Sequence, residues 1–186
     1  MKRGSELIVI DPRRTWLATR AKIWMQVRPG TDAALALGML NVIINEKLYD
    51  EEFVEKWTHG FDELNKRVQE YPPEKVAEIT WIPAEKIVEA ARMYGTSKPA
   101  AIQWGVAVDQ TRECLPTIHA LIALWTVTGN MDVPGGNIIG SRNFGFGGFY
   151  RREGEALTEE QRKKIIGVKN YPLLKSINMA DGEGLI

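Results

Sequence analysis

The sequence has very few of the residues that build disulfides and metal sites. It contains one cysteine, Cys114, and two histidines, His59 and His119, among its 186 residues. A single cysteine cannot form an internal disulfide or hold an iron–sulfur cluster, and a buried zinc ion is normally held by several cysteine and histidine ligands. We therefore assign no metal-ligating residue. Cys114 and His119 do not have a shared-face spacing on their predicted helix, so we interpret both as packing residues.

An excess of charge of one sign and long apolar runs are also missing. The 24 basic side chains balance 24 acidic ones, whereas sequence-independent nucleic-acid binding needs a basic excess. No apolar run approaches the roughly 20 residues that cross a bilayer, and residues 1–11 lack the features of a signal peptide. We expect no nucleic-acid partner, no membrane insertion and a cytoplasmic location. The abrupt start of a strand pattern is consistent with a domain that begins upstream or with a short natural N-terminus.

What the chain does have is an ordinary globular composition and alternating strand and helix patterns. Hydrophobic residues make up 44% of the sequence and charged residues 26%. Apolar runs predict strands at residues 6–11, 23–27 and 100–108. The first is expected to be buried on both faces, the second is partly alternating, and the third resumes the buried-strand pattern. Because helical patterns lie between these runs, the expected fold class is α/β, a Rossmann-like parallel sheet flanked by helices. A helical insert is expected at about residues 50–95.

Helices are expected where apolar residues recur at threes and fours between start and stop signals. Thr31 is the expected N-cap of a helix over residues 33–46, whose apolar positions lie almost all round and imply burial against a sheet. Asp50 can cap the next helix, and Gly129 suits the left-handed residue after a helix. The remaining helical patterns lie at residues 16–22, 50–57, 61–70, 73–80, 83–95, 113–128 and about 158–166.

The loops after the first two predicted strands are the first places to search for a ligand, because open α/β sheets bind ligands beyond the carboxyl ends of their strands. The first loop consists of Asp11, Pro12, Arg13, Arg14 and Thr15. Its two guanidinium groups present forked donors to phosphate. In the second loop, Gly30 permits close backbone approach, and the Asp32 carboxylate can accept paired hydrogen bonds from a guanine edge. Adenine lacks that pair of donors, so Asp32 would select guanine.

Each of these features also has a simpler explanation. The Asp11-Pro12 pair is most often a turn, surface arginines are usually solvated, and Asp32 is a favourable acid in the first turn of a helix. The glycine-rich segments at residues 129–137 and 145–149 match neither a Rossmann nor a Walker phosphate loop. Taken singly, the signals do not identify a site.

In combination, an ordered series of motifs resembles the molybdopterin oxidoreductase family, also called the dimethyl sulfoxide reductase superfamily. The motifs are LIVIDPRRT, VRPGTDAALALGMLNVII, LYDEEFVEKWTHGFDEL, AEITWIPAEKIVEAARMY and TGNMDVPGGN, which cover about residues 2–137. Within the family, GTDAAL, NVIINE, LYDEEFVE and RVQEYPPEKVAEIT are most similar to acetylene hydratase-like members. The resemblance implies two molybdopterin guanine dinucleotides around one molybdenum or tungsten atom, each held largely by a Rossmann-like domain.

The resemblance also implies roles for particular residues. The first loop, from Asp11 to Thr15, would line the guanosine and phosphate region, and the second loop, Gly30, Thr31 and Asp32, would include the aspartate that contacts guanine. Three further positions, Trp104, Gly105 and Gln110, correspond to a glycine-containing turn near the pterin. One departure is Lys22, where the family commonly has an acidic residue, and this change is expected to alter a local ion pair while sparing the loops. The segment from Gly140 to Phe149 is expected to line the substrate funnel.

The same resemblance implies that the chain is a fragment of the catalytic subunit of a larger enzyme. The family's cysteine cluster, metal ligand and C-terminal domain have no counterpart here, so no catalytic residue is assigned. The chain alone is expected to be inactive and to hold no bound cofactor. Its partner would be the remainder of the parent polypeptide, an oxidoreductase or an acetylene hydratase-like lyase. We place the cofactor-binding α/β region at residues 1–137 and a loop-rich tail at residues 138–186.

Two other functions stay open. The same loops would serve a free-standing guanine-nucleotide-binding module, and a purely structural domain would keep the scaffold without the ligand. An incomplete parallel sheet exposes an apolar edge, so self-association is expected as well. The sequence does not indicate the substrate, the reaction or the choice between molybdenum and tungsten.

Overall fold

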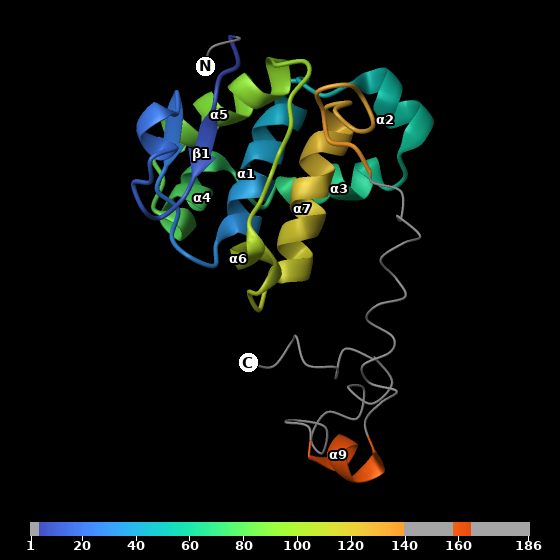
Figure 1. The fold of residues 1–186 in the computed structure, drawn as a ribbon. Helices are drawn as coiled ribbons and strands as arrows, with labels where there is room; N and C mark the ends of the chain where they lie inside the picture. The colour runs from blue at the N-terminus through green and yellow to red at the C-terminus, as the bar shows by residue number, and fades with distance from the viewer. Residues whose placement is uncertain (1–3, 140–157, 165–186) are drawn as a thin grey trace. The chain divides into compact units, whose positions relative to one another are not determined.

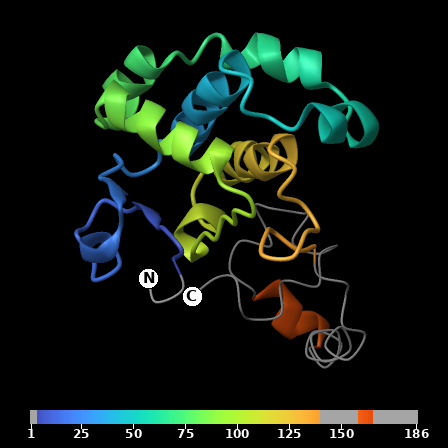
Figure 2. The same ribbon diagram turned by 90° about the horizontal axis from the view of Figure 1, so that it is seen from above.

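Residues 4–139 and 158–164 are described by a computed structural model, in which the chain divides into two units, residues 1–139 and 140–186. Figure 1 shows the first unit as a group of helices around α1 (Asp32–Asn45), and Figures 1 and 2 both place two short strands at one side of that group. In the second unit, α9 (Glu159–Lys163) falls within the helix expected at residues 158–166. Among the residues that the structure describes, no helix has both the length and the apolar character needed to span a membrane.

The sheet consists of two parallel strands, β1 (Ile8–Ile10) and β2 (Ile23–Met25), linked through the short 3-10 helix η1 (Ala18–Arg20). Because the strands are parallel neighbours, the loops that follow them leave from the same edge of the sheet. Strand β1 is only partly buried, and Ile10 is 40% exposed. The prediction that the first strand is buried on both faces is therefore wrong, because β1 lies at the edge of a two-stranded sheet.

The third expected strand, at residues 100–108, is not formed. Residues 101–105 have no regular structure, and the short helix α6 (Val106–Asp109) takes up the end of the run. The amide of Asn137 pairs with the backbone here, accepting from the Ile102 N–H at 2.9 Å and donating to the Ile102 carbonyl at 2.7 Å. Backbone groups that would join a sheet are therefore satisfied by a side chain, which apolar patterning does not show.

The long helices form where their start and stop signals predict them. They are α2 (Glu51–Trp57), α3 (Phe61–Val68), α4 (Pro73–Thr80), α5 (Ala84–Thr96) and α7 (Cys114–Val127). The Asp50 carboxylate caps α2 by accepting from the Phe53 N–H at 3.0 Å, and Gly129 after α7 has a φ of +67°. Thr31 stands at the N-cap position of α1 but makes no capping bond, because its hydroxyl donates to the Arg28 carbonyl at 2.7 Å.

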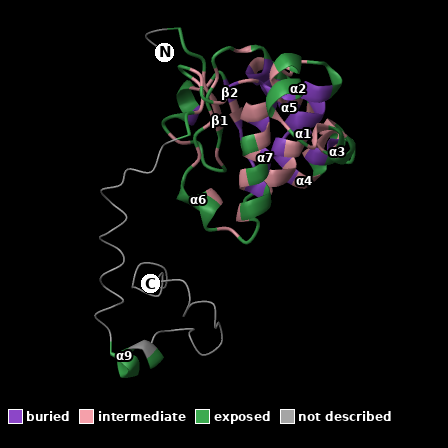
Figure 3. Cartoon of the chain, turned by 90° about the vertical axis from the view of Figure 1, so that its right-hand side faces the viewer, coloured by how far each residue is buried: buried purple, intermediate pink, exposed green. Residues whose placement is uncertain are grey.

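Helix α1 is the centre of the hydrophobic core, as its apolar residues on all sides predicted. Leu35, Leu40 and Ile43 are at most 1% exposed, and Figure 3 shows α1 as largely buried. It packs chiefly against α3, α4, α5 and α7. The expectation that a sheet covers this helix is wrong, because the helical segment after residue 50 supplies most of its cover. His119 is exposed and Cys114 half-buried, so the interpretation of His119 as a packing residue is also wrong.

Candidate nucleotide-binding site

The first loop is held in shape by its own side chains. The Asp11 carboxylate accepts from the Arg13 N–H at 2.7 Å, and the Thr15 hydroxyl accepts from the Ala18 N–H at 3.2 Å, at the start of η1. These two short polar residues therefore form the turn, as the simpler explanation of Asp11-Pro12 predicted. Arg13 and Arg14 are exposed, and neither forms an ion pair within the described part of the chain. The arginines are thus the residues of this loop that are left to contact an anion.

The end of β2 fastens the first loop in place. The Trp24 indole donates to the Asp11 carbonyl at 3.0 Å, and the Gln26 amide donates to the Pro12 carbonyl at 3.0 Å. The Asp11 N–H continues the strand pairing by donating to the Met25 carbonyl at 3.2 Å. Since Gln26 already belongs to the chain that leaves β2, the two loops share one framework at the same edge of the sheet.

The second loop is a tight turn that leads into α1. The N–H and the hydroxyl of Thr31 both donate to the Arg28 carbonyl, at 3.2 and 2.7 Å. Gly30 has a φ of +82°, and no atom lies within 4 Å of the place where a Cβ would stand. The backbone at Gly30 is thus left-handed and has open space beside it, a conformation that glycine adopts without strain.

Asp32 is the first helical residue of α1 and is half-buried. Its carboxylate makes no hydrogen bond or ion pair within residues 4–139 or 158–164. A carboxylate is a favourable group at this end of a helix because of the helix dipole. It therefore retains both oxygens for an incoming ligand.

Trp104, Gly105 and Gln110 come together around α6. Gly105 precedes the helix, Gln110 ends it, and the Trp104 indole donates to the Asp109 carboxylate at 3.1 Å. The Trp104 ring also stacks on Trp125 of α7, with ring centroids 5.6 Å apart. Figure 1 shows α6 at the same end of the first unit as the start of α1. The three residues are thus one group, on a different element from the two loops.

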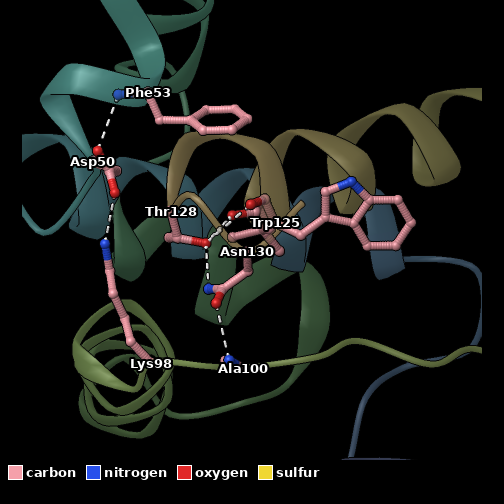
Figure 4. Close-up of polar contacts among 8 residues, drawn as sticks. Asp50, Phe53, Lys98, Ala100, Trp125, Thr128 and Asn130 are labelled. Carbon is pink, nitrogen blue, oxygen red and sulfur yellow. Dashed lines mark hydrogen bonds and ion pairs between the residues drawn. The ribbon is translucent and has the colours of Figure 1, made fainter. Parts of the chain in front are cut away.

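A polar network that the sequence did not predict holds the segment leading to Trp104 (Figure 4). Asn130 accepts from the Ala100 N–H at 2.9 Å and donates to the Thr128 hydroxyl at 2.9 Å, while Lys98 pairs with Asp50 at 2.8 Å. Hydrogen bonds from Lys98 and then from the Phe53 N–H hold the pKa of Asp50 below its usual range. The asparagines of the TGNMDVPGGN motif could have indicated this network in the sequence, because a buried side-chain amide needs hydrogen-bond partners.

Tyr94 lies beside this network. Its hydroxyl is near Thr128 and Asn130 but has no hydrogen bond of full geometry to either, and burial raises the pKa of Tyr94 to about 12. The group therefore stays protonated at ordinary pH and takes no part in the candidate site.

Three further predictions concern Lys22, residues 140–149 and metal binding. Lys22 pairs with Glu6 at 2.5 Å on the surface, away from the hydrogen bonds that shape the two loops. The segment from Gly140 to Phe149, expected to line a substrate funnel, lies outside the described residues. Among the residues that are described, no group of three or more histidine, cysteine or acidic side chains is placed to hold a metal ion.

The parallel strands and their helical cover define an α/β protein. The sequence model of the molybdopterin oxidoreductase family matches residues 1–181, and the chain belongs to that family. The resemblance seen in the motifs is confirmed, and the match extends beyond residue 137, where the recognised motifs end.

Individual relatives agree with this assignment. The chain is 48% identical over 181 residues to acetylene hydratase from Syntrophotalea acetylenica, covering 97% of this chain and 25% of that protein. It is 41% identical over 133 residues to formate dehydrogenase H from Escherichia coli (strain K12), covering 72% of this chain and 19% of that protein. The solved acetylene hydratase from Pelobacter acetylenicus is similar with a TM-score of 0.74 and 47% identity, over 93% of this chain and 24% of that structure. The chain thus spans about a quarter or less of these relatives' length.

Proposed function

We propose that this chain binds the guanosine and phosphate part of molybdopterin guanine dinucleotide, within the catalytic subunit of a molybdenum or tungsten enzyme. Family membership supports a molybdopterin cofactor in full-length relatives. One observation supports the guanine dinucleotide form of this cofactor. Two loops follow neighbouring parallel strands at the same sheet edge, and one has arginines without ion pairs while the other has a carboxylate without a partner. This chain would contribute orientation and anion binding.

The residues present fit such a ligand. Asp32 can accept from the N1–H and the 2-amino group of guanine, while Arg13 and Arg14 offset the charge of the pyrophosphate. Gly30 leaves room for the nucleotide to lie against the backbone. When bound, the cofactor supplies the metal and dithiolene chemistry, and the protein supplies position and electrostatics. Trp104, Gly105 and Gln110 are proposed as the residues nearest the pterin.

The guanine-reading role of Asp32 is tested by titrating the 186-residue chain with GDP and with ADP. We expect GDP to bind more tightly and Asp32→Asn to abolish the preference. Asparagine has an NH2 group in place of one carboxylate oxygen, and this donor would face one of the two guanine donors instead of accepting from it. Hydrogen bonds to a charged group contribute roughly 1.5–3 kcal/mol, so the preference should fall by about tenfold or more. Asp62→Asn is the matched control, since Asp62 is also an acid in a first helical turn, that of α3. An unchanged GDP to ADP ratio in Asp32→Asn would contradict the role.

The affinity itself separates the remaining alternatives. Part of a pocket should bind GDP weakly, with a Kd on the order of millimolar, whereas a free-standing guanine-nucleotide module should reach about micromolar or better. A purely structural domain should bind neither nucleotide. The wild-type titration therefore decides between the three functions that the sequence left open.

The phosphate-binding role of the first loop predicts a different signature. Replacing both Arg13 and Arg14 by glutamine should weaken GDP binding and reduce its dependence on salt, while guanosine binding stays unchanged. Arg20→Gln is the control, because Arg20 lies on the same connection but stacks on Trp16, at 4.0 Å from the ring centroid. Equal losses for GDP and guanosine would show that the arginines act on the fold and not on phosphate.

A further inference from the structure

Trp81 is exposed and strained in a way that packing does not explain. It ends α4 with a φ of +65°, in the left-handed region that favours glycine and asparagine. Its side chain is 68% exposed, so the indole buries little surface to compensate for the strain. A bulky residue held in such a conformation at the surface points to a role outside the fold itself.

Arg28 connects Trp81 to the candidate site. Its guanidinium carbon lies 5.0 Å from the centroid of the Trp81 ring, a cation–π arrangement. The Arg28 N–H donates to the Thr80 carbonyl at 2.9 Å, which ties the loop after β2 to the end of α4. The Arg28 carbonyl in turn receives both bonds from Thr31, next to Asp32. The indole and the guanine-reading turn therefore belong to one connected structure.

Arg28 also has no competing partner. Among residues 4–139 and 158–164 its guanidinium forms no ion pair, although it is exposed. Its contact with Trp81 is the interaction that fixes its side chain. A guanidinium placed over an aromatic ring, beside a turn proposed to bind a nucleotide, is suited to a planar, negatively charged ligand.

We propose that Trp81 and Arg28 form a stacking platform for the purine base of the nucleotide whose edge Asp32 reads. The inference rests on the proposed function and assigns separate roles to the platform and to Asp32. Aromatic rings and guanidinium planes stack on bases regardless of base identity, because every base has a π-face. The platform therefore contributes affinity for any purine nucleotide, and Asp32 contributes the preference for guanine.

Trp81→Gly tests the platform without endangering the fold. Glycine adopts a φ of +65° freely, so the thermal midpoint should stay the same or rise. Binding of GDP and of ADP is followed through the backbone amide resonances of the 186-residue chain, which remain present in every variant. We expect both affinities to fall by roughly tenfold, the order expected for loss of one stacking contact, with the GDP to ADP ratio unchanged. Trp81→Phe should restore most of the affinity.

The matched control is Trp57→Ala. Trp57 is 76% exposed on α2, so its removal also deletes an exposed tryptophan, and it should leave both affinities unchanged. Arg28→Ala should weaken both nucleotides as Trp81→Gly does, and combining the two substitutions should weaken binding by less than the product of the single effects, because they remove one platform.

The outcomes separate the platform from the proposed function. If Trp81→Gly leaves both affinities unchanged while Asp32→Asn abolishes the guanine preference, the platform is wrong and the proposed function stands. If Trp81→Gly weakens both nucleotides and Asp32→Asn has no effect, the platform stands and the guanine-reading role fails. If neither nucleotide perturbs the wild-type backbone amide resonances at concentrations on the order of 10 mM, where even weak sites fill, both are overturned.

Discussion

At the scale of single residues, Asp50 joins two parts of the fold through one carboxylate. One oxygen caps α2 through the Phe53 N–H at 3.0 Å, and the other pairs with Lys98 at 2.8 Å. Both contacts favour the ionised form and lower the pKa of Asp50 from its ordinary value of 3.8. A group whose pKa is lowered by folding stabilises the protein above its unfolded pKa, and this contribution is lost as the pH falls.

Asp50→Ala should therefore destabilise the chain in a pH-dependent way. Loss of the cap is expected to lower the free energy of unfolding by about 1 kcal/mol at pH 7, with a small addition from the exposed ion pair. The difference from wild type should shrink as the pH falls from 3.8 through the lowered pKa of the folded state, because the folded carboxylate becomes protonated there. Urea unfolding at several pH values measures this. Lys98→Met, which keeps the cap, should have the smaller effect, and a difference that does not change with pH would count against the explanation.

Gly30 and Gly129 both have left-handed backbones, but only Gly129 is crowded by a neighbouring side chain. Substitutions at the two positions therefore distinguish the cost of backbone strain from the cost of a steric clash. Gly30 has a φ of +82° and open space around it, whereas a Cβ at Gly129, with a φ of +67°, would lie 2.6 Å from an oxygen of Asp50. Gly30→Ala should lower the free energy of unfolding by about 1 kcal/mol through backbone strain alone. Gly129→Ala should lower it by about 2 kcal/mol, because Asp50 must also leave its cap. In an Asp50→Ala background the excess should vanish, and its persistence in urea unfolding would refute the crowding argument.

At the scale of elements, local signals predicted the helices well and their surroundings poorly. The capping residue Asp50 and the stop residue Gly129 act over neighbouring residues, so they could be found in the sequence. The cover of α1 could not be predicted, because an all-round apolar helix is compatible with a sheet or with other helices. The run at residues 100–108 was mistaken for a strand because the partners of its backbone, Asn130 and Asn137, lie far along the chain.

The candidate site shows the same limit. The two loops and their arginines, glycine and carboxylate were identified from residue type and from their place after strands. The sequence did not show that Gln26 links the two loops or that Asp11 and Thr15 hold the first loop in shape. These features depend on hydrogen bonds that only the folded chain shows. Trp81 was missed because the sequence presents it simply as the residue after a helix, and its left-handed backbone is not visible there.

The packing of α1 on α4 depends on one close contact. A Cβ at Gly38 would lie 2.9 Å from a methyl carbon of Val76, which is fully buried. Gly38→Ala should therefore be destabilising by about 1–3 kcal/mol through overpacking, although alanine favours a helix. Val76→Ala removes the opposing methyl groups, so the double variant should be more stable than the sum of the two single losses implies. Additive losses in chemical denaturation would show that the two positions are not coupled.

At the scale of the whole molecule, the helical layer leaves an apolar face without cover among the described residues. Leu115 and Ile122 lie two turns apart on one side of α7, and Val106 of α6 is exposed as well. Helices α6 and α7 are in contact, so Val106 lies on an element that adjoins α7. Exposed apolar surface of this kind promotes association in water. Self-association was expected from an open sheet edge, and the structure offers α7 as a second source.

We predict that the 186-residue chain self-associates through this face of α7. Light scattering should show an apparent mass that rises with protein concentration, and Leu115→Lys combined with Ile122→Lys should abolish the rise, because burying two unpaired ammonium groups is unfavourable. The control adds the same charge elsewhere, with Leu17→Lys and Trp57→Lys at other exposed apolar positions. If the control pair lowers the apparent mass equally, general charge repulsion and not the α7 face is responsible. A wild-type mass that stays monomeric at high concentration would refute association altogether.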